Sequence, residues 1–254
     1  GGDNMLIQTG DIFDRGPYAL ECVRYLMDLQ QQAGPDKVVV TLGNHEVMQY
    51  EHNPYIHEFD IISCGGLENR LELFSPSKPI GRWLTTLPLA VRERRTGIVA
   101  SHGCILPFYQ HVTLESLNNH AYHLMSTSTT YQGLANSIRH SHFMNGDGSV
   151  LWNRSWFEYP EILDNFSKVA KNWNASAFVV GHTISPTMVP SVHTLDGIRV
   201  IQNDCGNSSW IHDGKYMPRH RICWTEYLID KDKWFIDNVP LVVPSEYGTS
   251  IPKQ

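Results

Sequence analysis

The chain has 254 residues, of which 41% are hydrophobic and 18% charged, with a formal net charge of −6. This composition is typical of globular proteins, and the acidic balance argues against a protein that holds nucleic acid on a basic surface. No apolar run approaches the length of a membrane span. The length suits one large domain, and we expect a single domain covering residues 1–254.

The cysteines indicate the compartment. Their number, five, is odd, and none has CxxC spacing. This pattern favours reduced thiols over a disulfide framework and predicts an intracellular protein.

The first predicted strand carries the most informative stretch. Residues 5–7 form a short apolar run, and the polar sequence of residues 9–17 follows it directly. Two carboxylates, Asp11 and Asp14, and a cation, Arg15, therefore lie in a tight loop before a helix predicted over residues 17–33. Such a loop suits cations and an anionic substrate better than it suits a core.

The next strand is predicted over residues 37–42, where three valines follow one another. It ends on Gly43-Asn44-His45-Glu46. A long polar and aromatic segment, roughly residues 48–86, comes after it. We expect this segment to cover the site or to hold short helices.

The middle of the chain repeats the arrangement. A strand predicted over residues 96–100 ends on Ser101-His102-Gly103. Residues 114–140 have a mainly helical pattern that a Ser/Thr run at 126–130 interrupts. A further apolar stretch, 150–152, ends on Asn153-Arg154.

The last third contains a helix, two strands and a hairpin. The helix is predicted over residues 161–173, begun by a proline. The strands are predicted over 177–180, which ends on Gly181-His182-Thr183, and over 198–201. Two apolar runs, 224–229 and 234–237, flank a polar turn and predict the hairpin.

Polar side chains thus follow several apolar strands directly, as in sites built at the strand ends of layered α/β proteins. Asp11, Asn44, His102 and His182 come from four different strand ends. Carboxylate, carboxamide and imidazole donors without thiols suit a hard or borderline divalent cation. Together they predict a metal site.

These motifs resemble those of a known family. Gly10-Asp11-Ile12-Phe13-Asp14-Arg15-Gly16, Gly43-Asn44-His45-Glu46, Ser101-His102-Gly103 and Gly181-His182 are similar to the ordered motifs of the phosphoprotein phosphatases, within the calcineurin-like metallophosphoesterases. Residues 8–17, 151–154 and 179–183 resemble the Shewanella-like (bacterial-like) branch. The resemblance covers residues 1 to about 210 and implies an α/β fold, the metallophosphatase αββα sandwich of two mixed β-sheets flanked by helices.

The resemblance also implies roles for individual residues. Asp11 would bridge two divalent ions (Mn, Fe or Zn), and Asn44, His102 and His182 would complete the ligands of the second ion. His45 would be the general acid, oriented by Asp14. Arg15 and Arg154 would bind the phosphate oxygens.

The chain departs from the family pattern in one important place. The first motif, Asp-x-His-Gly, lies upstream of the bridging aspartate and supplies ligands to the first ion, and residues 1–10 do not contain it. We therefore expect the first metal site to be incomplete in this chain. Asn203-Asp204-Cys205-Gly206 occupies the region of the usual C-terminal aromatic motif, and Asp204 is a candidate for supporting the metal ligands.

The function implied is hydrolysis of a phosphomonoester by a metal-activated hydroxide, with a phosphoprotein or phosphopeptide as the substrate. Phosphotyrosine and phosphoserine/threonine both remain open. No nucleic-acid partner is expected, and the chain is expected to be a monomer. Two alternatives stand beside this interpretation: a dinucleoside polyphosphate hydrolase, and a non-catalytic phosphate-binding protein with a degenerate metal site.

Overall fold

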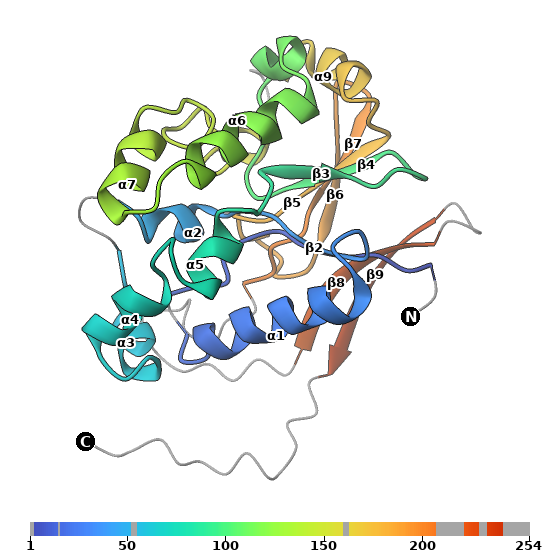
Figure 1. Cartoon of the computed structure of the whole chain (residues 1–254). Coiled ribbons are helices and arrows are strands. Elements are labelled where there is room, and N and C mark those ends of the chain that lie inside the picture. Colours follow the sequence, from blue (N-terminus) through green and yellow to red (C-terminus); the bar gives the residue numbers. More distant parts are fainter. Residues whose placement is uncertain are drawn as a thin grey trace.

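The structure is a computed structural model, and it describes residues 3–14, 16–51, 55–159, 163–206, 221–228 and 233–240. Figure 1 shows strands at the centre and helices around them, so the α/β class is confirmed. No helix in the described ranges combines the length and the apolar character that crossing a membrane would require.

The first layer is a parallel pair of strands, β1 (Leu6–Gln8) and β2 (Val38–Val40), with Leu6 opposite Val38. All three valines of β2 are buried, as expected for a strand covered on both faces. The crossover between the two strands is α1 (Ala19–Ala33), which packs on β2. It ends at Gly34, whose φ of 92° is open to glycine at little cost.

The second layer is a five-stranded mixed sheet in the order β3-β4-β5-β7-β6. Its strands are β3 (Ala90–Arg92), β4 (Ile98–Ser101), β5 (Ala177–Val180), β6 (Ser191–Leu195) and β7 (Ile198–Gln202). The central three, β4, β5 and β7, are parallel, and the two edge strands run antiparallel to their neighbours. The carboxyl ends of the central strands therefore open on the same edge.

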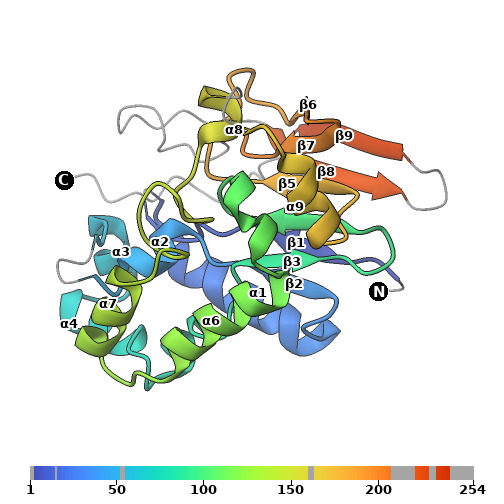
Figure 2. The same cartoon turned by 90° about the horizontal axis from the view of Figure 1, so that it is seen from above.

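Helices lie around these layers, as Figure 2 shows from above. Their bounds are α2 (Asn44–Met48), α3 (Glu58–Ser63), α4 (Leu67–Leu73), α5 (Pro79–Leu84), η1 (Pro107–His111), α6 (Leu114–Ser126), α7 (Tyr131–Arg139), α8 (Ser155–Glu158) and α9 (Phe166–Asn172). Helices α3 and α5 pack on α1, α6 packs on α7 and β3, and α9 packs on η1 and β7. One hydrophobic cluster includes Val40 of β2, Val99 of β4 and Phe178 of β5, so the two layers share a core.

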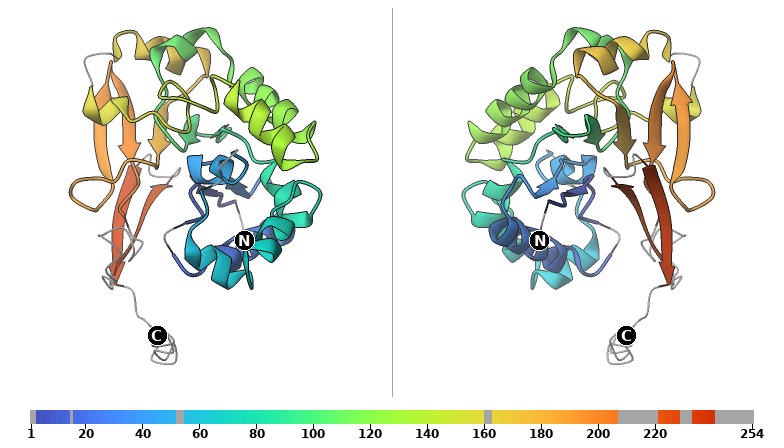
Figure 3. Two further views of the ribbon diagram at one scale, coloured as in Figure 1. Left: turned by 90° about the vertical axis from the view of Figure 1, so that its left-hand side faces the viewer. Right: turned by 90° about the vertical axis from the view of Figure 1, so that its right-hand side faces the viewer.

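A hairpin follows the large sheet. It consists of β8 (Arg221–Leu228) and β9 (Lys233–Pro240), which pair antiparallel. In both views of Figure 3 the two red strands of the hairpin lie below the orange strands of the large sheet.

Most predicted elements are present, with small shifts at their ends. The interruption at residues 126–130 separates α6 from α7, and the hairpin is confirmed. The described part of the segment after α2 holds three short helices. The helix predicted over residues 161–173 starts later among the described residues: α9 begins at Phe166, after Asn165, which adopts a left-handed conformation with φ of 72°. Residues 161 and 162 lie outside the described residues. The edge strands β3 and β6 were not predicted.

The turn between β3 and β4 provides a test of pH-dependent stability. The Glu93 carboxylate accepts hydrogen bonds from the Thr96 backbone N–H (2.7 Å), the Thr96 hydroxyl (2.6 Å) and Arg95 Nε (3.2 Å). Partial burial acts to raise the pKa of Glu93, but these bonds outweigh it and lower the pKa to about 2. A carboxyl group with a lowered folded-state pKa stabilises the fold above its unfolded pKa of about 4.5, and this contribution disappears as the pH falls toward 2.

We therefore expect Glu93→Gln to lower the free energy of unfolding at pH 7. We expect this decrease to become smaller as the pH falls from 4.5 to 2. Urea unfolding across this range measures it. Glu226→Gln, at an exposed position of β8, is the matched control. A deficit that stays constant with pH would contradict the assignment.

Candidate metal and phosphate site

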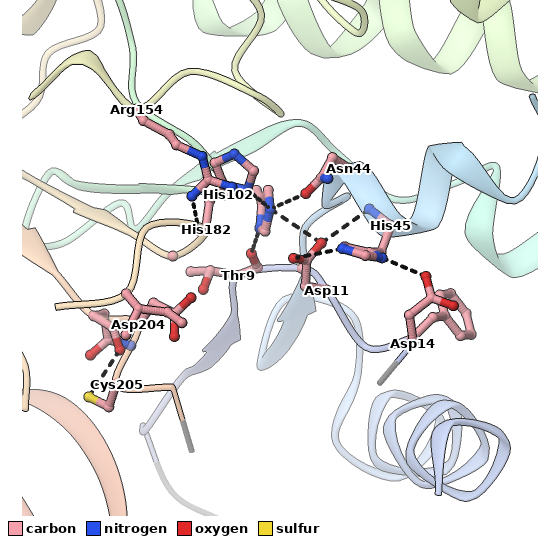
Figure 4. A pocket seen from close by; sticks show the side chains of 15 residues that line it. Thr9, Asp11, Asp14, Asn44, His45, His102, Arg154, His182, Asp204 and Cys205 are labelled. Carbon is pink, nitrogen blue, oxygen red and sulfur yellow. Dashed lines mark hydrogen bonds and ion pairs between the residues drawn. The ribbon is translucent and has the colours of Figure 1, made fainter. Parts of the chain in front are cut away.

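The polar residues predicted from strand ends line one cavity of about 510 Å³. Strands β1 and β2 run parallel, as do β4, β5 and β7, so their following loops meet at one place. Figure 4 shows these side chains pointing toward one another. The cavity is lined by Asp11, Asp14, Asn44, His45, His102, Arg154, His182 and Asp204, together with Thr9 and neighbouring residues.

His102 is at the centre of the cluster. Its Nε2 atom lies 2.9 Å from Asn44 Oδ1, 3.0 Å from His182 Nδ1 and 3.3 Å from Asp11 Oδ1. Ligand atoms of Asp11, His102 and His182 all lie within 4.8 Å of one another. The structure therefore brings together all four side chains predicted to bind metal.

Two backbone carbonyls determine the tautomers of the histidines. The Nδ1 atom of His102 is 2.7 Å from the carbonyl oxygen of Thr9, and Nε2 of His182 is 3.1 Å from the carbonyl oxygen of Trp152. A carbonyl oxygen only accepts, so these ring nitrogens carry the protons. Nε2 of His102 and Nδ1 of His182 consequently face each other with lone pairs. Such outer contacts orient metal-binding histidines.

The centre thus contains acceptors that face one another without a hydrogen between them. Two imidazole lone pairs, a carboxylate oxygen and the oxygen assigned to the Asn44 amide repel one another unless a cation lies among them. Ligands bound at about 2.1 Å to a single ion stand roughly 3 Å apart, which matches these separations. The residues present fit a divalent ion with oxygen and nitrogen ligands.

The protonation of the cluster also suits a cation. Burial, then repulsion from Arg154 and from His102 whenever that ring is protonated, lowers the pKa of His182 to about 3, so the His182 ring is neutral at pH 7. Burial acts to raise the pKa of Asp11, but His102, His45 and a backbone N–H outweigh it and the pKa is lowered. Asp11 is therefore ionised and His182 neutral, the forms in which both bind metal.

Backbone strain gathers at the same residues. Asp11, Asp14 and His182 adopt positive φ angles of 57°, 67° and 61°. A non-glycine residue in this region costs on the order of 1 kcal/mol, and such residues collect at functional sites. The surrounding structure must hold them there.

Glu46 supplies part of that support, a role that the sequence did not reveal. Its carboxylate accepts the backbone N–H groups of Asp11 (2.8 Å), Ile12 (2.7 Å) and Gly43 (2.6 Å). Burial, then the charge of Asp11, raises the pKa of Glu46 to about 7. A glutamate three residues into a helix is a known capping position, and that spacing from Gly43 was the available signal.

His45 and Asp14 form a pair beside the cluster. Nδ1 of His45 lies 2.5 Å from Asp14 Oδ2, and the Asp14 side chain is fully buried. The other Asp14 oxygen accepts the His57 backbone N–H at 3.2 Å. Nε2 of His45 lies 4.0 Å from Asp11 Oδ2. One ring nitrogen of His45 is therefore held by a carboxylate while the other faces the cluster.

The predicted phosphate-binding arginines have different outcomes. Arg154 is in the cavity wall, and its Nη1 donates to the carbonyl oxygen of His182 at 2.5 Å. Arg15 lies outside the described residues. Asp204 lines the cavity, where its Oδ1 accepts the Gly206 N–H at 2.8 Å.

Comparison with known proteins agrees with the motifs. The family model for calcineurin-like phosphoesterases matches residues 1–186. Shewanella-like protein phosphatase 1 of Plasmodium berghei is 25% identical over 91% of this chain, which spans 67% of that relative's length. The symmetrical bis(5'-nucleosyl)-tetraphosphatase of Legionella pneumophila is 29% identical over 42% of this chain and 36% of its own length.

A solved structure shows the same fold. The cold-active protein-tyrosine phosphatase of a psychrophilic Shewanella species superposes with a TM-score of 0.66 at 22% identity, covering 92% of this chain and 70% of that chain. The family resemblance inferred from the motifs is confirmed, and so is the similarity to the Shewanella-like branch.

The close contact between Gly43 and the loop that carries Asp11 yields a first prediction for the site. A Cβ atom at Gly43 would lie 2.4 Å from Asp11 N and 2.5 Å from Asp11 Oδ1. Gly43→Ala should therefore displace Asp11, lower the free energy of unfolding by about 1–3 kcal/mol and reduce bound metal. Gly148→Ala is the control, because its Cβ would meet only Phe108, at an ordinary 3.7 Å. Thermal unfolding and elemental analysis compare the two; equal behaviour would contradict the prediction.

The second prediction concerns the charge of the cluster. Asp11→Asn keeps the shape of the side chain and removes the anionic ligand, so metal content after dialysis should fall well below that of the wild type. Far-UV circular dichroism checks that the fold is retained. Full retention of metal by the folded variant would refute Asp11 as a ligand.

Proposed function

The chain belongs to the calcineurin-like phosphoesterase family, and we propose that it is a metal-dependent phosphatase that hydrolyses phosphomonoesters on proteins. One observation carries this proposal: four acceptor side chains converge beside an imidazole–carboxylate pair in a single cavity. The relative from Plasmodium berghei, a protein phosphatase by name, supports the choice of substrate class.

Asp11, Asn44, His102 and His182 would hold one divalent ion, with Mn, Fe and Zn all compatible with these donors. Asp11 would be shared with a second ion, whose remaining ligands are not among residues 1–10. Bound ions in such a site lower the pKa of water and offset negative charge on phosphoryl oxygens. The chain's own side chains position the ester and handle the proton.

His45 acts as the general acid in this proposal. Phosphorus gains a bond to the attacking hydroxide and loses its bond to the leaving oxygen. The electron pair of the broken bond stays on the leaving oxygen, which takes the proton of His45 Nε2. Asp14 holds the opposite nitrogen at 2.5 Å, which fixes the ring orientation and favours the protonated ring. General acid catalysis of this kind contributes about 10²–10⁴ in rate.

Arg154 binds the phosphate in this proposal. One of its nitrogens donates to the His182 carbonyl, and this contact fixes the side chain in the cavity wall. Its remaining N–H groups are available to oxygens of the ester, for which a guanidinium fork is well suited. Arg15, adjacent to Asp14 in the chain, is proposed for the same task.

A dinucleoside polyphosphate hydrolase is the second candidate, favoured by the similarity to the tetraphosphatase of Legionella pneumophila. Both reactions use a metal site and an acid, so the substrate distinguishes them. The intracellular location and the monomeric state stay predictions; free thiols at Cys22, Cys64 and Cys104 are consistent with a reducing compartment.

A substrate panel tests the proposed function. The purified chain, supplied with Mn²⁺, is assayed on phosphotyrosine and phosphoserine peptides and on diadenosine tetraphosphate. Faster release of phosphate from a peptide supports a protein phosphatase, and preference for the dinucleotide supports the second candidate. Binding of phosphate without turnover of any ester would support a non-catalytic protein.

His45→Asn provides the sharper prediction. The substitution removes the acidic nitrogen but leaves the four metal-binding side chains unchanged, so turnover should fall about 10²–10⁴-fold at nearly normal metal content. His142→Asn makes the same change at an exposed position and is the control. An unchanged rate in His45→Asn would exclude the acid role.

A further inference from the structure

A guanidinium is buried behind the His45–Asp14 pair. Arg70, on α4, is 1% exposed and is among the largest fully buried side chains. Burying a charged group is unfavourable unless it is compensated by hydrogen bonds and opposite charge. Figure 1 shows α4 in the group of short helices that follows α2 in the chain. The contacts of Arg70 indicate what the buried guanidinium does there.

One contact reaches the helix that carries His45. Nη2 of Arg70 donates a hydrogen bond to Gln49 Oε1, and Gln49 Nε2 donates in turn to the His45 carbonyl oxygen at 2.9 Å. The same Gln49 nitrogen approaches the Tyr55 carbonyl oxygen at 3.4 Å. Gln49 is itself buried. A single buried amide thus links Arg70 to the main chain of His45.

A second contact reaches the loop that carries Asp14. The Arg70 guanidinium lies 3.4 Å from the centroid of the Phe74 ring and 5.7 Å from that of Phe13. The two rings pack edge to face with their centroids 5.0 Å apart. Phe13 directly precedes Asp14 and is 2% exposed. Cation–π contact with desolvated rings is favourable, so Arg70 stabilises the position of this loop.

The buried charges near Arg70 also favour a role in holding the loop that carries Asp14. Asp60, on α3, is 2% exposed. Burial, then the charge of Asp14, raises the pKa of Asp60 to about 6, while the charge of Arg70 opposes that rise. The two buried carboxyl groups of Asp14 and Asp60 therefore lie near one another, and the charge of Arg70 is attractive to both. The hydroxyl groups of Tyr50 and Tyr131 donate to the carbonyls of Phe74 and Leu71 of the Arg70 helix region.

We propose that Arg70 is a positioning residue that, through Gln49 and Phe13, holds the His45–Asp14 pair in the orientation needed to protonate the leaving group. This inference rests on the proposed function, because it assigns Arg70 to the step in which His45 acts. Arg70 itself does not line the cavity. Its proposed effect on catalysis acts through the alignment of the acid.

A pair of substrates separates this role from a merely structural one. The leaving group of p-nitrophenyl phosphate departs readily without a proton, whereas that of phenyl phosphate, of similar shape, is more basic and needs the acid. Arg70→Met should lower kcat on phenyl phosphate about tenfold more than on p-nitrophenyl phosphate, with KM for both little changed. His45→Asn should show the same bias, and combining the two substitutions should not increase it.

Arg82→Met makes the same change in an exposed arginine on α5 and should show no bias. Among the hydrogen bonds of the described residues, Arg82 Nη2 contacts only the Ser77 carbonyl. Gln49→Glu keeps an acceptor for Arg70 and removes the donor to the His45 carbonyl. It should therefore show the same larger loss of kcat on phenyl phosphate, while the buried charge of Arg70 is retained. If Arg70→Met does not fold, Gln49→Glu and Arg70→Lys provide the same measurement. Thermal unfolding accompanies every variant.

The outcomes distinguish failure of the proposed function from failure of the positioning role. A wild type that hydrolyses neither ester overturns the proposed function and this inference with it. A bias in His45→Asn without one in the Arg70 and Gln49 variants leaves the acid role standing and overturns the positioning role. Equal loss on both esters in the Arg70 variants also overturns it, since that is the effect of general destabilisation.

Discussion

The main physical constraint on the site is the mutual repulsion of its acceptor atoms. Nε2 of His102 has three acceptor atoms within 3.3 Å, and the Thr9 and Trp152 carbonyls orient the two rings so that neither can relieve the repulsion by donating a hydrogen bond. Such an arrangement persists only if the rest of the fold imposes it, as the positive φ angles at Asp11 and His182 also show. Because native stability is only about 5–15 kcal/mol, this strain is a substantial demand on the packing of the two layers.

The two layers contribute different parts of the site. The parallel pair β1–β2 brings Asp11, Asn44 and the His45–Asp14 pair, whereas the large sheet brings His102 and His182. The His102–Thr9 hydrogen bond crosses between the layers. A Cβ at Gly181 would lie 2.9 Å from the Thr9 hydroxyl, so the layers also touch closely there. The proposed acid and the proposed metal ligands are consequently aligned by the same shared core, and a shift of one layer would displace both groups of residues.

The sequence predicts the strand-end residues well because each motif combines a local signal with a chemical one. A buried valine run that ends on Gly-Asn-His-Glu identifies both the strand and the donors. Edge strands carry less information: β6 is largely exposed and has no regular alternation, and its pairing with β7 depends on tertiary contacts. The tautomers of His102 and His182 depend on backbone carbonyls far away in the chain, which no local pattern encodes. Arg70 was not predicted either, since an arginine in a polar helix suggests solvent exposure.

The distribution of charge links the metal site to its support. Asp11 has a lowered pKa, whereas those of Glu46 and Asp60 are raised, to about 7 and about 6. The Asp11 charge contributes to the rise at Glu46, and the Asp14 charge contributes to the rise at Asp60, while Arg70 opposes it. A cation held by Asp11 would offset the first repulsion, as Arg70 offsets the second. The Glu46 carboxylate that holds the Asp11 loop and the buried Asp60 carboxyl are thus both affected by the charges of the site residues.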